Sequence, residues 1–184
     1  DIENVVELKG GDSYTQVFDI NRSCSQVVSY GSKRKYTGHV IESWLNVIEV
    51  ESGQTIREIG RSEGAIASAA FIPNTSYVAI GYEKGAIKIC DTETGEFPKT
   101  RYILESGAVK KIKASPAAPV MLSWAYDSVH FKVWSTESWK MQQTLEHEHG
   151  SPNGFGYITD FFFSHDGTDM ISLGKGKLSK WKTA

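Results

Sequence analysis

The sequence is poor in cysteine and has no long apolar run. Its two cysteines, Cys24 and Cys90, lie inside strand-like segments rather than in a spaced framework, which predicts buried free thiols in a reducing cytoplasm and argues against a disulfide or metal role. The longest apolar stretches, such as Ala65–Ile72, are far shorter than the roughly 18 to 20 residues that span a bilayer. We therefore expect no transmembrane segment.

An excess of charge is also missing. The formal net charge of −2 gives no bulk attraction to nucleic acid or to an acidic membrane, so we expect no nucleic-acid partner. The chain has instead what a globular β-protein needs, with 40% hydrophobic residues for a core and 17 glycines for turns.

A repeated segment organises the chain. Leu45–Gly53 aligns without gaps on Ile87–Gly95, and both read apolar, polar, apolar, apolar, acidic and then a turn. The pattern recurs as Phe131–Glu137 and, near the C-terminus, as Leu178–Lys182. The fourth slot of the pattern holds Ile48, Cys90, Trp134 and Trp181. Successive separations of 42, 44 and 47 residues fit the roughly 40 to 45 residue period of propeller blades better than helical repeats of about 33 or 34.

Each unit also contains period-2 strands bounded by turn residues. The predicted strands are Tyr14–Ile20, Gln26–Tyr30, Leu45–Val50 and Thr55–Ile59; Ile66–Phe71, Tyr77–Gly81, Ala86–Cys90 and Arg101–Leu104; Ala108–Ala114, Val120–Ser123, His130–Trp134 and Met141–Leu145; and Tyr157–Ser164, Met170–Leu173 and Lys177–Trp181. The last unit lacks an outer strand, and an orphan strand at Asn4–Leu8 is expected to supply it, which would remove an exposed edge.

The predicted fold is therefore an all-β propeller of four four-stranded blades in one domain, residues 1–184. The blades cover about 11–60, 61–105, 106–150, and 151–184 together with 1–10. Propellers span roughly four to eight blades, so the chain could close alone, pair as two half-rings, or belong to a larger ring. We favour an incomplete ring, because exposed blade faces favour further stacking.

The repeat resembles the WD40 family, and more narrowly the N-terminal propeller of the coatomer β′ family of vesicle-coat subunits. The resemblance is carried by Ser115–Ser123, Phe131–Trp134 and Trp139–Glu146. It implies a non-catalytic protein-interaction scaffold in intracellular transport, located in the cytoplasm or peripherally on Golgi membranes or transport vesicles. A WD40 adaptor in signalling or in ubiquitin-ligase substrate recognition is the alternative, and an enzyme-associated domain comes third.

Departures from the family are as informative as the matches. WD40 blades join a His, a Ser or Thr, an Asp and a Trp by hydrogen bonds, and the third unit approaches this set through Ser123, Asp127 and Trp134. Glu105 or Ser106 stands where the His is expected. The fourth unit keeps Trp181 as a structural residue, whereas Ile48 and Cys90 occupy the Trp slot of the first two units. Loss of the hydrogen-bonded set predicts lower local stability there.

The family's readers of C-terminal dilysine tails use acids for the lysines and basic residues for the terminal carboxylate. By alignment, the basic positions fall at Ser13 and Thr15 and the acidic ones at Gly107 and Tyr126, while Lys110 is kept. Without facing carboxylates, a pair of ammonium groups loses its charge-assisted hydrogen bonds. We therefore expect no ordinary dilysine binding.

Two basic clusters are candidates for partner binding through the loops of one end. The insertion Ser32–His39 between two strands of the first unit is read as a solvated loop, with contact to phosphate or an acidic partner as the alternative. In Lys110–Lys113, alternation sends Lys111 and Lys113 to one face and Lys110 to the other, which favours a solvent-facing strand end over an anion site. The candidate contact residues are Lys33, Arg34, Lys35, Tyr36, Lys110, Trp124, Tyr126 and His130, because loop aromatics and cations are common interface anchors.

Motifs for chemistry are scarce. His147 and His149 would share one face of a strand, but no third metal ligand is evident, so a structural role is favoured. The glycine-rich turn Gly174–Lys177 lacks the spacing of a phosphate-binding loop. No serine elbow, paired carboxylate motif or Cys-His arrangement with plausible spacing is present in the sequence. We predict a protein that is not an enzyme and uses no metal or cofactor.

Overall fold

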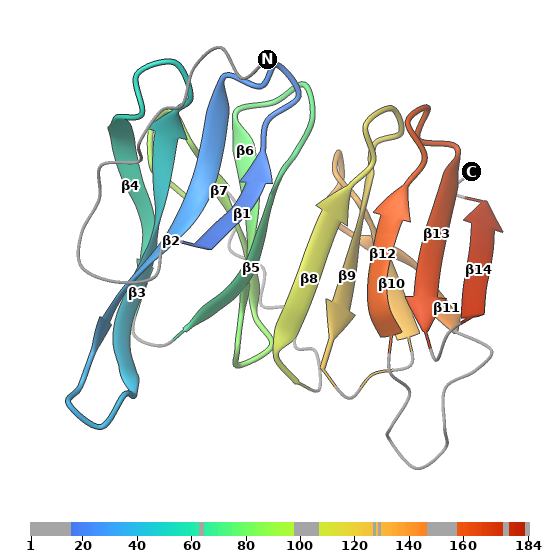
Figure 1. The fold of residues 1–184 in the computed structure, drawn as a ribbon. Helices are drawn as coiled ribbons and strands as arrows, with labels where there is room; N and C mark the ends of the chain where they lie inside the picture. The colour runs from blue at the N-terminus through green and yellow to red at the C-terminus, as the bar shows by residue number, and fades with distance from the viewer. Residues whose placement is uncertain are drawn as a thin grey trace, which may run out of the picture.

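The structure, a computed structural model, describes residues 16–62, 65–97, 107–126, 128, 130–146, 158–174 and 177–182. Within these residues the fold consists of fourteen strands in four antiparallel sheets (Figure 1). The all-β prediction is thus confirmed. The described residues include no helix that is long and apolar enough to cross a membrane.

The four sheets follow the order of the chain, and within each the strands pair with their neighbours in sequence. Sheet 1 contains β1 (Gln16–Ile20), β2 (Gln26–Arg34), β3 (Val40–Glu49) and β4 (Thr55–Ser62). Sheet 2 contains β5 (Ile66–Phe71), β6 (Tyr77–Tyr82) and β7 (Ile87–Asp91). Sheet 3 contains β8 (Val109–Ala114), β9 (Val120–Ala125), β10 (His130–Ser135) and β11 (Met141–Glu146). Sheet 4 contains β12 (Ile158–Phe163), β13 (Asp169–Gly174) and β14 (Lys177–Lys182).

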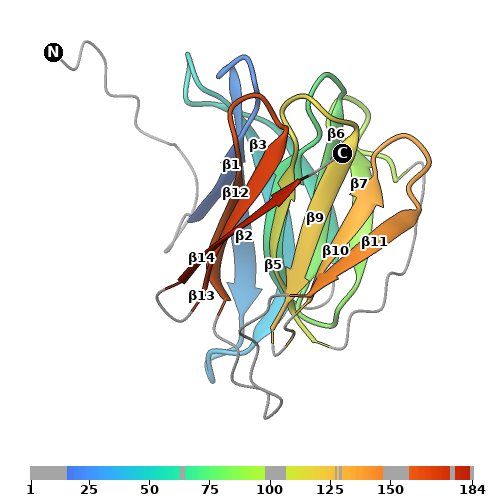
Figure 2. The ribbon, with the colours of Figure 1, turned by 90° about the vertical axis from the view of Figure 1, so that its right-hand side faces the viewer.

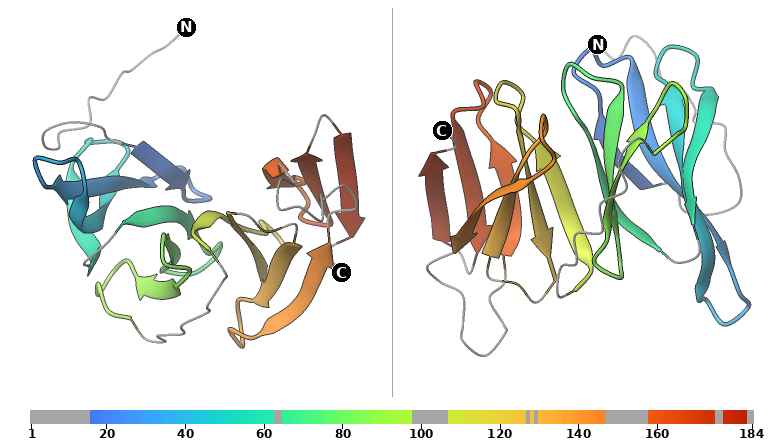
Figure 3. Two further views of the ribbon diagram at one scale, coloured as in Figure 1. Left: turned by 90° about the horizontal axis from the view of Figure 1, so that it is seen from below. Right: turned by 180° about the vertical axis from the view of Figure 1, so that it is seen from behind.

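The sheets stand side by side around an arc, with sheets 1 and 4 at its two ends (Figure 3, left). Seen from the side, the strands of neighbouring sheets run roughly along a common direction (Figure 2). The repeated strand–strand–strand pattern therefore builds one sheet per unit, and all four sheets present their turns at the same two ends.

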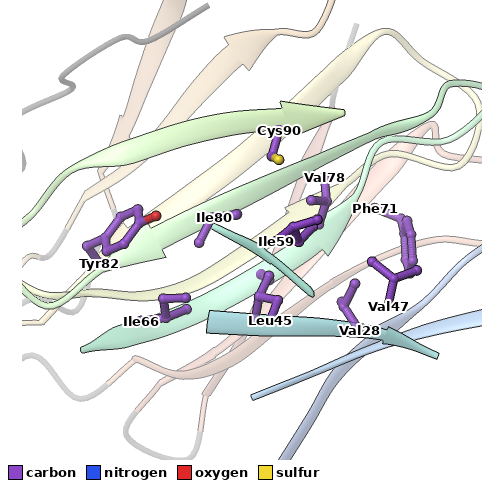
Figure 4. Packing of buried hydrophobic residues seen from close by; sticks show 11 residues of the cluster. Val28, Leu45, Val47, Ile59, Ile66, Phe71, Val78, Ile80, Tyr82 and Cys90 are labelled. Carbon is purple, nitrogen blue, oxygen red and sulfur yellow. The ribbon is translucent and has the colours of Figure 1, made fainter. Parts of the chain in front are cut away.

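Each core cluster joins two consecutive sheets. The first cluster fills the space between sheets 1 and 2 with side chains such as Leu45 and Val47 from β3 and Val78 and Ile80 from β6 (Figure 4). The second joins sheets 2 and 3, and the third joins sheets 3 and 4. Because side chains alternate along a strand, the middle sheets bury both faces, as the near-continuous burial of β6 shows.

The third cluster is centred on an aromatic pair. Phe131 of β10 and Phe161 of β12 are both fully buried, and their rings meet edge to face with centroids 5.1 Å apart. This arrangement sets the positive edge of one ring against the negative face of the other. The pair therefore ties sheet 3 to sheet 4.

Two tryptophan–serine hydrogen bonds repeat across sheets 3 and 4. Trp134 Nε1 donates to Ser123 Oγ at 2.9 Å, as the WD40 resemblance implies, while Asp127 of the same set lies outside the described residues. Trp181 Nε1 donates in the same way to Ser172 Oγ at 3.1 Å. The serine–tryptophan contact of the third unit therefore recurs in the fourth, where Ser172 lies nine rather than eleven residues before its tryptophan.

The corresponding serine of sheet 1 has no such donor. Ser29 pairs with Asn46, and two residues before Ser29, Val27 pairs with Ile48 in the tryptophan slot. Ser123 holds the same place in sheet 3, because Met121, two residues before it, pairs with Trp134. Ser29 is fully buried, and its hydroxyl has no hydrogen-bond partner among the residues that the structure describes. Ile48 in the tryptophan slot therefore leaves a buried polar group unsatisfied.

Alanine substitution of the two serines should consequently act in opposite directions. Ser29→Ala is expected to raise the free energy of unfolding by about 1 kcal/mol, because it removes an unpaired buried hydroxyl. Ser123→Ala should lower it by about 1 kcal/mol, because it leaves the Trp134 Nε1–H without an acceptor. Urea denaturation followed by tryptophan fluorescence measures both. A loss of stability in Ser29→Ala equal to that in Ser123→Ala would contradict the assignment.

Several local expectations need correction or lie beyond the described residues. Cys24 was expected to be buried in a strand, but it is exposed in the turn between β1 and β2 and has a φ of 56°. Cys90 is buried, and burial followed by the charge of Asp91 raises the pKa of its thiol to about 11, so the thiol is protonated at neutral pH. The predicted strands Asn4–Leu8 and Arg101–Leu104 fall outside the described residues.

Candidate functional site

A basic cleft lies at one of the two ends where the sheets present their turns. The strand starts of β1, β5 and β8 meet there with the β2–β3 hairpin and the β6–β7 turn, because antiparallel neighbours reverse direction at the same edge. The cleft has a volume of about 860 Å³. We call this space the basic cleft, and the residues that line it are Gln16, Tyr30, Arg34, Gly38, His39, Val40, Ile41, Ala65, Ile66, Ala67, Glu83, Lys84 and Lys110.

The hairpin forms one wall of the basic cleft. The sequence suggested a loop from Ser32 to His39, but the ladder between β2 and β3 continues to the pair Arg34–Val40, so that interpretation was wrong for its first three residues. The turn is closed by Lys35 N donating to His39 O and Gly38 N donating to Lys35 O, both at 2.8 Å. Gly38 has a φ of 84°, a conformation that suits glycine.

Side-chain contacts also stiffen this hairpin. Arg34 Nη1 donates to the carbonyl oxygen of Gly38 at 3.1 Å, and the Thr37 hydroxyl lies 3.0 Å from His39 Nδ1. Arg34 therefore holds its own turn while its side chain lines the cleft. A cation held in place loses less conformational entropy on binding than a free one.

The opposite wall comes from sheets 2 and 3. Glu83 and Lys84 lie in the β6–β7 turn, where Glu83 N donates to Ala65 O at 3.0 Å and draws that turn towards the start of β5. Lys110 enters from β8, with its Nζ 5.5 Å from the centroid of the Tyr126 ring. The cation lies within the range of a cation–π contact, so Tyr126 positions Lys110 at the cleft.

The electrostatics of the basic cleft are one-sided. Arg34, His39, Lys84 and Lys110 line it with basic groups, while Glu83 is the one acidic side chain among the described residues of the lining. The cleft therefore attracts anions and repels ammonium groups. Sequence reasoning selected Arg34 and Lys110 but missed His39 and Lys84, because the cleft joins three sheets and no single segment signals it.

The remaining candidate contact residues are separated from the cleft. Lys33, Lys35 and Tyr36 are exposed on the hairpin but do not line it, and Lys33 is paired across the ladder with Glu42. Trp124 Nε1 donates to Ser128 O at 2.8 Å, and the ring packs against the third core cluster, which gives it a structural role. His130 lies in β10 with a buried Nδ1 that has no partner within the described part of the chain.

The other two lysines of β8 are used inside the fold. Lys110 is exposed, whereas Lys111 and Lys113 are half-buried, so the expected solvent-facing position of these two lysines was wrong. A register shift between Val109 and Lys111 also interrupts the alternation that the sequence analysis assumed at Lys110. Lys113 Nζ lies 2.9 Å from Asp19 Oδ1, and Lys111 Nζ forms an ion pair with Asp160. Burial, then repulsion by Lys113, lowers the pKa of Lys111 to about 8, while Asp19 opposes the shift.

These ion pairs connect the first strands of all four sheets. Besides its contact with Lys113, Asp19 accepts a hydrogen bond from Phe71 N at 2.9 Å, so it joins β1, β5 and β8. The pair of Lys111 with Asp160 extends the connection to β12. The lysines of this network have partners, which leaves Lys110 as the lysine of β8 that can face a ligand.

A second cleft of about 830 Å³ lies at the opposite end, between the turns of sheets 1, 2 and 3. Its charges are mixed and largely engaged: Lys113 contacts Asp19, and Arg22 Nη1 donates to the carbonyl oxygen of Pro116 at 3.0 Å. No group of three metal-ligating side chains occurs among the residues with described positions, and His147–His149 lie outside them. The basic cleft is thus the stronger candidate for a binding site.

Comparisons with known proteins bear on the fold alone. No family model and no curated protein matches the chain. Among solved structures, the computationally designed Ika4 protein is similar with a TM-score of 0.67 and 19% identity, over 99% of this chain and 99% of that chain. The computationally designed Ika8 protein is similar with a TM-score of 0.66 and 19% identity, over 96% of this chain but 48% of that chain. The present chain therefore spans about half the length of Ika8.

Proposed function

We propose that this protein is a non-catalytic WD40-type β-propeller scaffold that binds an acidic peptide segment of a partner protein in the basic cleft. The observation that carries the proposal is the cleft of about 860 Å³ whose lining, among the described residues, holds four basic side chains and one carboxylate. An extended peptide that carries carboxylates gains charge-assisted hydrogen bonds from Arg34, Lys84 and Lys110. The aromatic ring of Tyr126 beside Lys110 adds an exposed apolar surface at the rim.

The lining supports binding rather than catalysis. The part of the lining that the structure describes holds no serine, threonine or cysteine that could act as a nucleophile and no pair of carboxylates for acid–base work. Two of its basic side chains are instead held in place, Arg34 by the hairpin turn and Lys110 by the Tyr126 ring. A preorganised set of cations suits recognition of an anionic partner.

The same charges argue against a dilysine ligand, as the sequence predicted. Lys84 and Lys110 repel two ammonium groups, and within the described lining Glu83 alone offers them a carboxylate. A side chain at Gly107, one of the family's acidic positions, would place its Cβ 2.7 Å from the Tyr126 carbonyl oxygen. We propose, on the resemblance of residues 115–146, that the partner belongs to vesicle transport, with a role as an adaptor in signalling or ubiquitin-ligase recognition as the alternative.

A binding titration tests the peptide proposal. Fluorescence anisotropy with a glutamate-rich peptide should show saturable binding that weakens as salt rises, while a dilysine-tailed peptide should not bind. Lys110→Glu should weaken the acidic peptide about tenfold or more, because it reverses one of the facing charges. Lys140→Glu is the matched control: it makes the same change in net charge at an exposed residue next to β11, outside the cleft, and should leave binding within about twofold.

Three outcomes would contradict the proposal. Equal weakening by Lys140→Glu would show a general effect of net charge rather than a site. Tighter binding of the dilysine-tailed peptide would reverse the expected preference. Complete displacement of the acidic peptide by inorganic phosphate, at a phosphate concentration similar to that of the peptide, would identify a phosphate site in place of a peptide groove.

A further inference from the structure

Most exposed large hydrophobic side chains lie on the two outermost sheet faces. Phe162, Ile171 and Leu178 are exposed on the face of sheet 4 that points away from sheet 3. Val17 and Ile20 are exposed on the face of sheet 1 that points away from sheet 2, and Ile56 is exposed in the outer strand β4, next to Thr55, which pairs with Ile48. We call these the open face of sheet 4 and the open face of sheet 1. Contiguous apolar surface of this kind marks an interaction site.

Strand pairing assigns the open face of sheet 4. Phe161 and Met170 are buried towards sheet 3 in the third core cluster, so their neighbours Phe162 and Ile171 point the other way. Phe162 is paired with Ile171, and Leu178 is paired with Leu173, two residues further along β13. These side chains therefore lie together on one surface.

The repeat shows that this surface occupies the place of a sheet junction. Leu178 aligns with Leu45, Ile87 and Phe131, which are 0%, 1% and 0% exposed because the following sheet covers them, yet Leu178 is 73% exposed. Ile171 pairs with the residue just before the fourth repeat slot, as Ala79 and Leu122 do in sheets 2 and 3. Ala79 and Leu122 are 0% and 1% exposed, whereas Ile171 is 40% exposed. Sheet 4 thus presents the residues of a junction, and none of the other three sheets of the described chain covers them.

The open face of sheet 1 is the complementary half of such a junction. Cys90 and Trp134 in the fourth repeat slot face the preceding sheet, so Ile48 in the same slot lies on the face of sheet 1 that points away from sheet 2. Ile48 itself is 3% exposed, and the exposed apolar area of this face comes from its neighbours. Ile20 lies on the same face as Ile48, because Ile20 pairs with Val27 and Val27 pairs with Ile48. Val17, Ile20 and Ile56 are 48%, 46% and 49% exposed.

We propose that two copies of this chain associate, the open face of sheet 4 of each copy packing on the open face of sheet 1 of the other. The new junctions continue the serial packing that already joins sheets 1 to 4, with the same faces in the same order. A twofold axis makes the two junctions identical and closes an eight-sheet ring without free faces. The fold of Ika8, which contains this arrangement in about half of its length, supports a larger assembly of the same type.

Sedimentation velocity of the purified chain tests the proposal. The expected mass is twice the 20.4 kDa of one chain. Leu178→Asp and Ile56→Asp should each weaken the dimer at least tenfold, because they bury an unpaired charge in both junctions. Met141→Asp is the matched control, since Met141 is 52% exposed on the outer strand of sheet 3 and away from both open faces. It should leave the dimer intact, and circular dichroism should show all three variants folded.

Mixing the two disruptive variants gives a sharper test. In either variant alone, both junctions of the dimer carry one aspartate. In a mixed dimer of Leu178→Asp with Ile56→Asp, both aspartates fall in one junction and the other junction is native, so the mixture should dimerise more tightly than either variant. A general loss of folding or solubility cannot produce this restoration.

A native chain of monomeric mass at its highest soluble concentration would overturn the proposal, as would a dimer that persists in both aspartate variants. A mass of more than two copies would show that the open faces join head to tail without closing a ring. Association that depends on another protein and not on a second copy would assign the open faces to sheets from that partner.

Discussion

Replacing Phe131 with alanine is expected to lower the free energy of unfolding by about 3–5 kcal/mol, the largest effect of any single change considered. The ring is fully buried and meets Phe161 edge to face, so its loss removes apolar burial and the aromatic contact together. The backbones of β10 and β12 belong to separate sheets and are held by their own ladders, so they close only part of the resulting cavity.

Equilibrium denaturation in urea at a fixed protein concentration measures this effect, because association would make stability depend on concentration. Met141→Ala, at a half-exposed side chain of the outer strand β11, is the control and should cost less than about 1 kcal/mol. A loss below about 1 kcal/mol in Phe131→Ala would mean that sheets 3 and 4 do not share a core.

Gly81→Ala should cost about 2–3 kcal/mol, although alanine is ordinarily the better residue in regular structure. Gly81 is not among the glycines with positive φ, so the backbone accepts alanine and the penalty is steric. A Cβ at Gly81 would lie 2.6 Å from Ser68 Oγ and 2.7 Å from Val109 Cγ1. Relief requires either a shift of β8 away from sheet 2 or rotation of Ser68, whose hydroxyl donates to Val109 O at 2.6 Å.

A double-mutant cycle isolates the cause. Val109→Ala removes the Cγ1 that the new Cβ would meet at 2.7 Å and keeps the Val109 Cβ at 2.9 Å, so Gly81→Ala should cost about 1 kcal/mol less in that background than in the native chain. Strictly additive losses would show that the close approach of sheets 2 and 3 at Gly81 is not what disfavours a side chain there.

The sequence predicted the strands most accurately where apolar and polar residues alternate between clear turns. Ile66–Phe71 was predicted with the bounds that β5 has, and His130–Trp134 differs from β10 by one residue at its end. The prediction failed at Ser32–Arg34, because a polar and basic segment gives no alternation, yet the ladder with β3 satisfies its backbone groups. Cys24 was misplaced for a related reason, since its position depends on the turn that Asn21 stabilises by accepting from Ser25 N at 2.9 Å.

The candidate site was predictable only in part. Arg34 and Lys110 were identified from local clusters of charge, but they are distant in sequence and are joined by Lys84 and His39, which no motif marks. The same limit applies to the ion pairs of Lys111 and Lys113. Nothing in the sequence around Asp19 or Asp160 indicates a partner in β8, because the pairing depends on how four sheets are arranged around the arc.

The sequence by itself determined that this chain forms four similar β units, because the order of apolar, polar and acidic residues repeats with the spacing of a blade. Strand identity follows from local alternation, which is a property of neighbouring residues. The tertiary structure alone decided that Lys110 faces a cleft while Lys111 and Lys113 are neutralised, and that Leu178 is exposed where Leu45, Ile87 and Phe131 are buried. These outcomes depend on which sheet lies against which, and the same residue pattern is buried or exposed according to whether a following sheet covers it.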